Sequence, residues 1–137
     1  MSDVRKYAVD PGARLHLRDA NDELMFADDA KLKPIAVNLH GPGSKQYAKA
    51  QAAQQNRMID KLKRKGKTEQ TAEQKAAEVA DFLTDCTASF ENMEYDELQG
   101  DALAHAVYSD LSIGFVAEQV NKFLGDWSNF TKGSTKT

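Results

Sequence analysis

The sequence predicts an α+β fold that is mostly helical, with a small antiparallel β element near the N-terminus. Two patterns predict it. Within residues 13–39, apolar and polar side chains alternate with the period of two typical of strands. Beyond residue 44, apolar side chains recur at every third or fourth position, as on one face of a helix. With 137 residues, the chain is long enough to bury the core of one domain. We expect this domain to cover residues 1–130, with a β-rich part at 13–40 and a helical part at 44–130.

The β element should contain two or three short strands. Residues 13–18 alternate small or apolar with polar side chains, and residues 34–39 carry Ile, Val and Leu at every second position. Residues 19–22 are rich in Asp and Asn, which tolerate tight turns, so residues 23–26 are a candidate hairpin partner. Pro34 suits the beginning of the last strand, because proline cannot donate a backbone hydrogen bond.

Two long helices should follow the turn at residues 41–44. Ser44 is a suitable N-cap for a helix over residues 45–65, which are rich in Ala, Gln and Lys. Thr71 and Gln74 form a capping-box pattern at the start of the next helix. We expect this second helix to continue to Phe90 and to form the centre of the core. Its apolar stripe steps alternately by four and three residues: Ala72, Ala76, Val79, Leu83, Cys86 and Phe90.

Two further helices are expected in the last third of the chain. Asp101 should cap a short helix, and residues 110–112 should separate it from a terminal helix that runs towards Phe130. The polar tail, residues 131–137, has nothing to bury and is expected to be disordered. One face of the terminal helix carries Ile113, Val116, Ala117, Val120, Leu124 and Trp127.

The terminal helix also carries more large apolar groups than one face can hide. Phe115, Phe123 and Phe130 lie off the apolar stripe or beyond its end. Large rigid rings dominate interface energetics. We therefore take Phe115, Phe123, Trp127 and Phe130 as candidate partner-binding residues. The alternative is that these rings close the core against the second helix, since aromatic groups at helical spacing are usually buried.

The charge distribution predicts that the first two helices pair. Residues 45–67 carry eight basic side chains against one acidic side chain, and residues 69–101 carry ten acidic side chains against one basic side chain. Adjacent blocks of opposite sign neutralise each other if the two helices fold back antiparallel. The basic run at residues 61–67 contains no aromatic group for base stacking, and the chain has a net charge of −3. Both observations argue against a nucleic-acid partner.

No combination of residues indicates chemistry. His16, His40 and His105 have no second ligand at metal-binding spacing, and Cys86 stands alone on an apolar stripe, as a buried structural thiol would. The Gly-Pro-Gly-Ser turn at residues 41–44 lacks the longer phosphate-binding loop. We expect a protein that is not an enzyme and has no metal or cofactor. The chain also has no apolar run long enough to span a membrane, and its first residues lack the apolar region of a secretory signal, so we expect a cytoplasmic protein.

The order of these segments resembles that of tail assembly chaperones of long-tailed, siphophage-type bacteriophages. The resemblance covers residues 13–130 and rests on short, degenerate motifs. These motifs are Leu-His-Leu-Arg-Asp at 15–19, Val-Asn-Leu-His-Gly-Pro-Gly-Ser at 37–44, Ala-Val-Tyr-Ser-Asp at 106–110, Phe-Val-Ala-Glu-Gln-Val at 115–120 and Gly-Asp-Trp-Ser-Asn-Phe at 125–130.

The resemblance implies a non-enzymatic protein of the host bacterial cytoplasm. Such a chaperone binds the phage tape measure protein, promotes polymerisation of the tail tube protein around it, and is absent from the mature virion. Many members also exist as a longer frameshift product. A structural head–tail connector or tail completion protein is the main alternative, followed by a small nucleic-acid-binding regulator. The sequence leaves open whether the chain forms a homo-oligomer.

Overall fold

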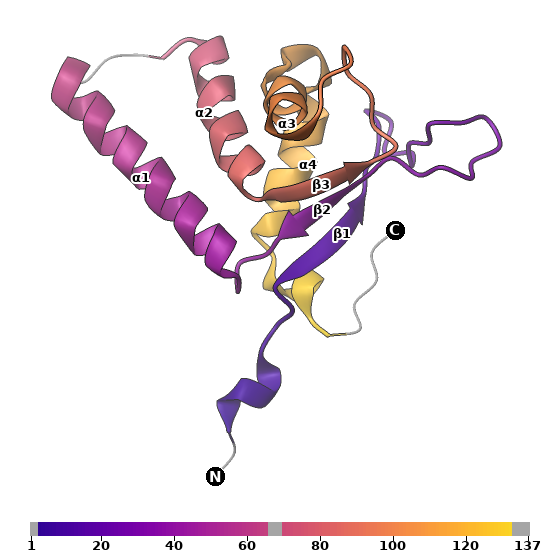
Figure 1. Ribbon diagram of the computed structural model, residues 1–137, viewed down its shortest axis with the longest axis horizontal. Helices are drawn as coiled ribbons and strands as arrows, with labels where there is room; N and C mark the ends of the chain where they lie inside the picture. The colour runs from indigo at the N-terminus through magenta and orange to yellow at the C-terminus, as the bar shows by residue number, and fades with distance from the viewer. Residues whose placement is uncertain (1–2, 66–69, 133–137) are drawn as a thin grey trace.

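A small antiparallel sheet lies beside a group of helices in the computed structural model, which describes residues 3–65 and 70–132 (Figure 1). The three strands are β1 (Gly12–His16), β2 (Ala36–His40) and β3 (Thr87–Glu91), in the order β1-β2-β3. The α-helices of the described residues are α1 (Lys45–Lys65), α2 (Ala72–Asp85), α3 (Gly100–Ser109) and α4 (Gly114–Leu124). Short 3₁₀ helices are η1 (Val4–Tyr7), η2 (Leu111–Ile113) and η3 (Trp127–Phe130). The α+β class and the predominance of helix are confirmed.

One face of the sheet is apolar and belongs to the core. On the central strand, Val37 lies opposite Leu15 of β1 and Phe90 of β3, and all three side chains share this face. Val37 is fully buried, and Leu39, two residues on, is 2% exposed. Since strand side chains alternate between faces, the pattern of residues 34–39 places its β-branched and leucine side chains where the helices cover them.

The other face of the sheet carries a ladder of polar side chains across all three strands. The Arg14 guanidinium donates to Glu91 Oε2 at 2.9 Å. The Asn38 amide donates to Ser89 Oγ and to Glu91 Oε2, both at 3.0 Å. These bonds cross β2 and therefore help to hold the register of the two outer strands.

The second helix is shorter than the sequence predicts, because Phe90 and its neighbours form a strand. α2 ends at Asp85, Cys86 caps it, and the next residues pair with the open edge of β2. The Thr87 hydroxyl donates to Leu83 O at 2.8 Å and so replaces a bond that a continued helix would make. A register shift opposite Asn38 and Leu39 puts Thr87 and Phe90 on the same face, which mimics helical spacing in the sequence.

The core side of α2 also differs from the predicted stripe. Ala80, Phe82 and Leu83 are the buried residues of this helix, whereas Ala72 is exposed and Val79 is 38% exposed. The Thr71–Gln74 capping box is confirmed in both directions. The sheet is likewise not wholly N-terminal, since its third strand follows α2.

The remaining differences concern ends of elements. Gln99, not Asp101, occupies the N-cap of α3, and it makes no side-chain cap bond. The terminal helix stops at Leu124, Gly125 caps it, and a separate 3₁₀ turn follows. Residues 23–26 form no strand, and their backbone pairing is limited to isolated bridges, Arg18 to Leu24 and Phe26 to Pro34. The predicted disordered tail lies mostly outside the described residues.

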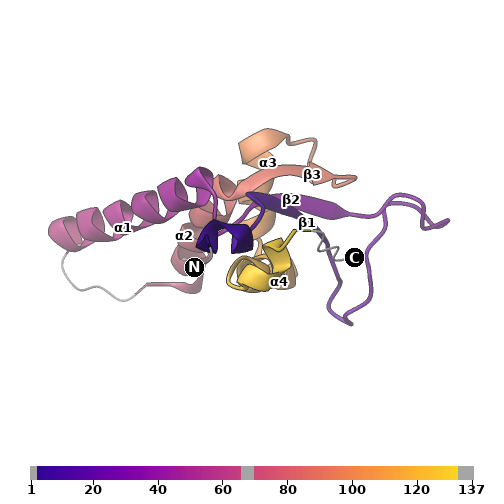
Figure 2. The same ribbon diagram turned by 90° about the horizontal axis from the view of Figure 1, so that it is seen from below.

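The helices form the core with the apolar face of the sheet. Buried side chains from α2, α3 and α4 join those of β2 in one cluster. Gln119 links α4 to the chain that follows β1. Its side-chain amide accepts a hydrogen bond from Arg18 N and donates one to Arg18 O, both at 2.8 Å. From this body, α1 extends to one side and the loops of residues 17–35 extend to the other (Figure 2).

The end of the described chain is packed against the turn that precedes α1. Phe130 is 1% exposed and its ring contacts Phe123 with centroids 5.4 Å apart. Asp10 N donates to Phe130 O at 2.7 Å, and Gly41 N donates to Pro11 O at 2.7 Å. A β-carbon at Gly41 would lie 2.3 Å from Phe130 Cδ2. Glycine is therefore required at position 41 by the close approach of this ring.

We expect the Gly41→Ala substitution to lower the free energy of unfolding by about 1–3 kcal/mol, because the added methyl group overpacks the Phe130 ring. Urea unfolding monitored by circular dichroism measures the effect. Gly114→Ala is the control, since no heavy atom lies within 4 Å of its β-carbon position. That substitution should leave stability unchanged or raise it by up to about 1 kcal/mol. Equal effects of the two substitutions would contradict the proposed contact.

We expect Leu83→Ala to cost about 2–5 kcal/mol of unfolding free energy, because Leu83 is fully buried in the cluster. The matched substitution Val79→Ala, one turn earlier on α2, should cost less than about 1 kcal/mol, because much of that side chain remains in water. Thermal and urea unfolding of both variants provide the comparison. A loss at position 79 as large as that at position 83 would show that the predicted stripe, not the observed one, is buried.

Candidate interaction surface

The four candidate partner-binding rings do not form one surface. Phe123 and Phe130 are buried at 7% and 1% exposure and contact each other inside the molecule. Phe115 is partly buried against the core cluster. Trp127 alone of the four is well exposed, at 57%. The four rings do not share one face because α4 ends before Gly125. Residues 127 and 130 lie in a separate 3₁₀ helix and therefore do not follow the helical spacing that the sequence predicts.

Trp127 lies where three segments of the chain meet. A β-carbon at Gly43 would lie 3.7 Å from the Trp127 ring, in van der Waals contact, and 2.7 Å from Val9 Cγ2, which is closer than van der Waals contact allows. The short helix η1 precedes Val9 and projects from the body with exposed Val4 and Tyr7 (Figure 1). The residues around Trp127 thus offer an exposed apolar corner, but the other candidate rings do not contribute to it.

The distal half of α1 carries a second exposed apolar strip. Met58, Ile59 and Leu62 are between 49% and 60% exposed. Positions three and four apart are neighbours on a helix surface, so these side chains lie together. We call them the α1 strip. In the sequence, Ile59 and Leu62 belong to a thin apolar stripe within residues 45–65, with Met58 beside it. The structure leaves these three side chains exposed.

The side of α1 that faces α2 is attached by two kinds of contact. Near the start of the helix, Ala50 is buried and the Tyr47 ring meets Phe82 edge-on at 5.7 Å between centroids. Further along, Lys61 Nζ donates to Glu78 Oε1 at 2.5 Å, and Arg57 lies 3.9 Å from Asp81 and 3.8 Å from Asp85. The predicted neutralisation of opposite charges between the two helices is confirmed.

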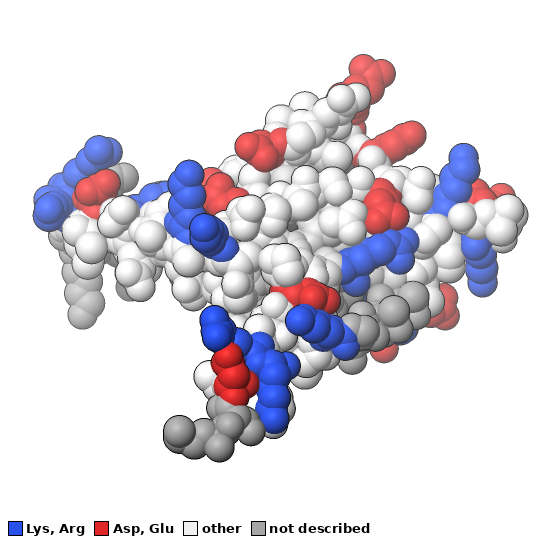
Figure 3. Space-filling model, turned by 60° about the horizontal axis from the view of Figure 1, so that its bottom comes forward, with Lys and Arg blue, Asp and Glu red and all other residues white. Residues whose placement is uncertain are grey.

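These ion pairs engage two of the basic side chains of α1, Arg57 and Lys61. Lys63 and Arg64 are exposed, and the rest of the predicted basic run (65–67) has no described side chain. On the face shown in Figure 3, Lys and Arg side chains stand in separate groups with Asp and Glu beside several of them. A continuous basic surface of the kind that follows a phosphate backbone does not appear on that face.

Two of the histidines and the cysteine make contacts within the fold. His16 is 5% exposed and its Nε2 lies 2.8 Å from Met25 O, while His105 Nε2 lies 3.0 Å from Asp81 Oδ1. Cys86 is buried, as expected, and desolvation raises the pKa of its thiol to about 12. At neutral pH this thiol is protonated and therefore a poor nucleophile. Among the described residues, no group of three His, Cys, Asp or Glu side chains is placed to hold a metal ion.

The Gly-Pro-Gly-Ser turn begins α1. The Ser44 hydroxyl accepts from Tyr47 N at 3.1 Å and donates to Gly41 O at 2.7 Å, so the predicted N-cap is confirmed. Since Ser44 is 7% exposed and both its bonds are internal, its hydroxyl is committed to the turn.

Comparison of the chain with protein-family models, with curated proteins and with solved structures finds no match. None of the described helices has both the length and the apolar character needed to cross a membrane.

We expect the Lys61–Glu78 pair to contribute a pH-dependent stabilisation of about 0.2–1 kcal/mol. The hydrogen bond from Lys61 lowers the pKa of Glu78 below its ordinary value of 4.5. A carboxyl with a lower pKa in the folded state stabilises the fold above the unfolded-state pKa, and this stabilisation is lost as the pH falls through the folded-state pKa. Urea unfolding should show a larger advantage of wild type over Glu78→Gln at pH 7 than at pH 3. In a Lys61→Met background the difference should largely disappear. An advantage that does not shrink as the pH falls would argue against the pair.

Proposed function

We propose that this protein is a non-enzymatic chaperone of bacteriophage tail assembly. In this proposal it binds the tape measure protein in the host bacterial cytoplasm, promotes polymerisation of the tail tube protein around that partner, and is not retained in the mature virion. The segment order that resembles such chaperones supports the proposal, and so does a surface suited to holding an apolar partner.

The observation that carries the proposal is the α1 strip. Met58, Ile59 and Leu62 remain exposed on a helix whose α2-facing side is already occupied by ring contacts and ion pairs. A partner that exposes apolar helical faces before assembly can bury those faces against such a strip. The charged residues around the strip keep the unbound chaperone in solution.

Trp127 is a second exposed apolar site in this proposal, and the one retained from the four rings inferred from the sequence. Its ring is accessible without unfolding, whereas exposure of Phe123 or Phe130 would open the core. A Phe130→Ala substitution would therefore mix loss of stability with loss of binding. Trp127 and the α1 strip can be changed without that ambiguity.

The test is co-expression of the chain with the tape measure protein of the same phage, with the soluble fraction of the partner as the readout. We expect Ile59→Gln with Leu62→Gln to weaken the complex at least about tenfold, because full burial of each side chain contributes roughly 1.5–3 kcal/mol. Trp127→Ala should weaken it by a similar factor. Circular dichroism and thermal unfolding should show that these variants remain folded.

The control is Leu32→Gln with Leu111→Gln, which removes two exposed leucines outside α1, at 79% and 56% exposure. These substitutions should leave the soluble yield of the partner unchanged. If the α1 variant keeps the partner soluble as well as wild type does, the strip is not the binding surface. If wild type itself neither binds nor solubilises the tape measure protein, the chaperone proposal fails.

Two other functions are separated by simple measurements. A head–tail connector or tail completion protein would be detected in purified virions, whereas a chaperone would not. A nucleic-acid-binding regulator would show strongly salt-dependent binding that is lost on reversal of the exposed Lys63 and Arg64 to Glu. We expect absence from virions and no measurable binding of DNA or RNA at low salt.

A further inference from the structure

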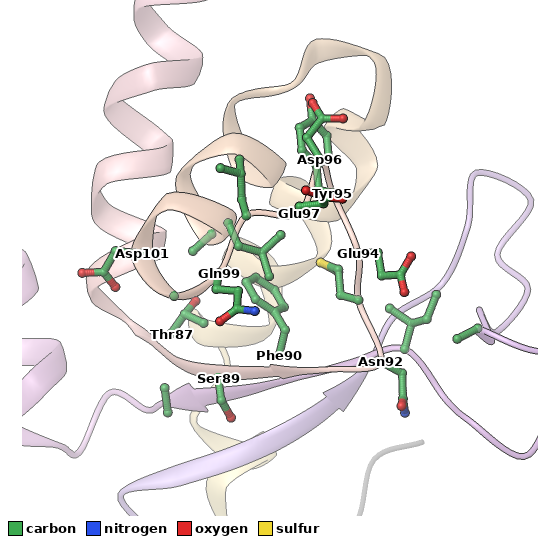
Figure 4. Close-up of a pocket in the computed structure, with 18 of the residues that line it drawn as sticks. Thr87, Ser89, Phe90, Asn92, Glu94, Tyr95, Asp96, Glu97, Gln99 and Asp101 are labelled. Atoms are coloured by element: carbon green, nitrogen blue, oxygen red, sulfur yellow. The ribbon is translucent and has the colours of Figure 1, made fainter.

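A large hollow lies along the outer edge of the sheet, away from the α1 strip. It has a volume of about 1480 Å³ and is enclosed by β3, the connector at residues 92–99 and the first turns of α3 (Figure 4). Four consecutive strand residues, Thr87–Phe90, line it. Its apolar lining includes Ile35, Phe90, Met93 and Leu103. The hollow therefore combines backbone and apolar surface.

The strand beside the hollow is an edge strand. β3 is the last strand in the order β1-β2-β3, and within the described residues β2 is its one ladder partner. Ala88 and Ser89 at its middle are exposed, and the strand contains neither Lys nor Pro, which commonly protect such edges. An unpaired strand edge presents N–H and C=O groups that an extended segment can pair with.

The connector that forms the far wall is held in place from within. The Tyr95 hydroxyl donates to Asp110 Oδ2 at 2.7 Å, and Leu98 N donates to Tyr95 O at 3.0 Å. Met93 and Tyr95 pack against the core cluster. The hollow is thus formed before any occupant arrives, which reduces the ordering cost of binding.

The charge of the lining favours a cationic occupant. Five carboxylates line the hollow against a single amine, that of Lys33: Asp28, Glu94, Asp96, Glu97 and Asp101. In Figure 4 the carboxylates of Glu94, Asp96 and Asp101 stand at its margin rather than over the strand. Carboxylates in this arrangement attract Lys or Arg side chains and disfavour acidic ones.

We propose that the hollow binds an extended segment of a partner protein in which large apolar side chains alternate with Lys or Arg, and that this segment adds to β3 as a fourth strand. Main-chain hydrogen bonds to β3 hold the segment. Its apolar side chains contact Phe90 and Leu103, and its cationic side chains meet the carboxylates at the margin. This inference does not depend on the tail assembly proposal, because it concerns a different surface and a partner defined only by its chemistry.

The test uses a blocked synthetic peptide in which Lys alternates with Val, titrated into the full-length chain and followed by calorimetry and amide hydrogen exchange. We expect saturable binding and slower exchange at Ala88–Phe90. A peptide of the same sequence, N-methylated at alternate residues so that it cannot pair with a strand edge, should not bind. The substitutions Glu94→Lys and Glu97→Lys together should weaken binding of the unmethylated peptide about tenfold.

The control variant carries Glu23→Lys and Glu118→Lys, which change the net charge equally at exposed sites outside the hollow. Its affinity for the peptide should match that of wild type. Equal binding of the methylated peptide, or equal weakening by the control variant, would show non-specific attraction and overturn the proposal. Protection confined to α1, or edge protection that appears with rising protein concentration in the absence of peptide, would also overturn it, the latter in favour of a second copy of the chain.

Discussion

The apolar face of the central strand has to be covered, and most of the fold follows from that requirement. Val37 and Leu39 are almost fully buried, yet the strands on either side are only five residues long and bring few apolar groups of their own. A sheet this small is marginal without packed helices. The covering side chains come from α2, α3 and α4, so segments from the middle and the end of the chain are tied to strands from its beginning.

Local signals in the sequence predicted the class, the beginnings of α1 and α2, and the charge pairing. Ser44 and Thr71 use short-range cap bonds, which the sequence contains in full. The strand at Thr87–Glu91 could not be predicted in this way, because its residues fit a helical stripe and become a strand only through pairing with β2. The same limit applies to the candidate rings. Phe130 is buried against Gly41, which is distant in sequence, whereas Trp127, three residues earlier, remains exposed.

Charge and apolar surface occupy different sides of α1, and this separation shapes the proposed function. Arg57 and Lys61 are turned towards the carboxylates of α2, whereas Met58, Ile59 and Leu62 remain accessible. The ion pairs are partly exposed and individually weak. They orient the helix rather than stabilise it greatly, and a partner that covers the strip meets a helix already positioned for contact.

The contact between Gly41 and Phe130 has a consequence for the order in which the protein folds during synthesis. The ribosome releases the strands and α1 long before it releases residue 130, and domains generally begin to fold as they emerge. Until Phe130 emerges, the surface at Gly41 lacks its ring, and Asp10 N lacks the carbonyl that accepts its hydrogen bond. A nascent chain therefore remains open at this junction until residue 130 has been released. A chain truncated before Phe130 would still contain the residues of β1–β3 and α1–α4. Its N-terminal segment, however, would lack the hydrogen bond from Asp10 N to Phe130 O.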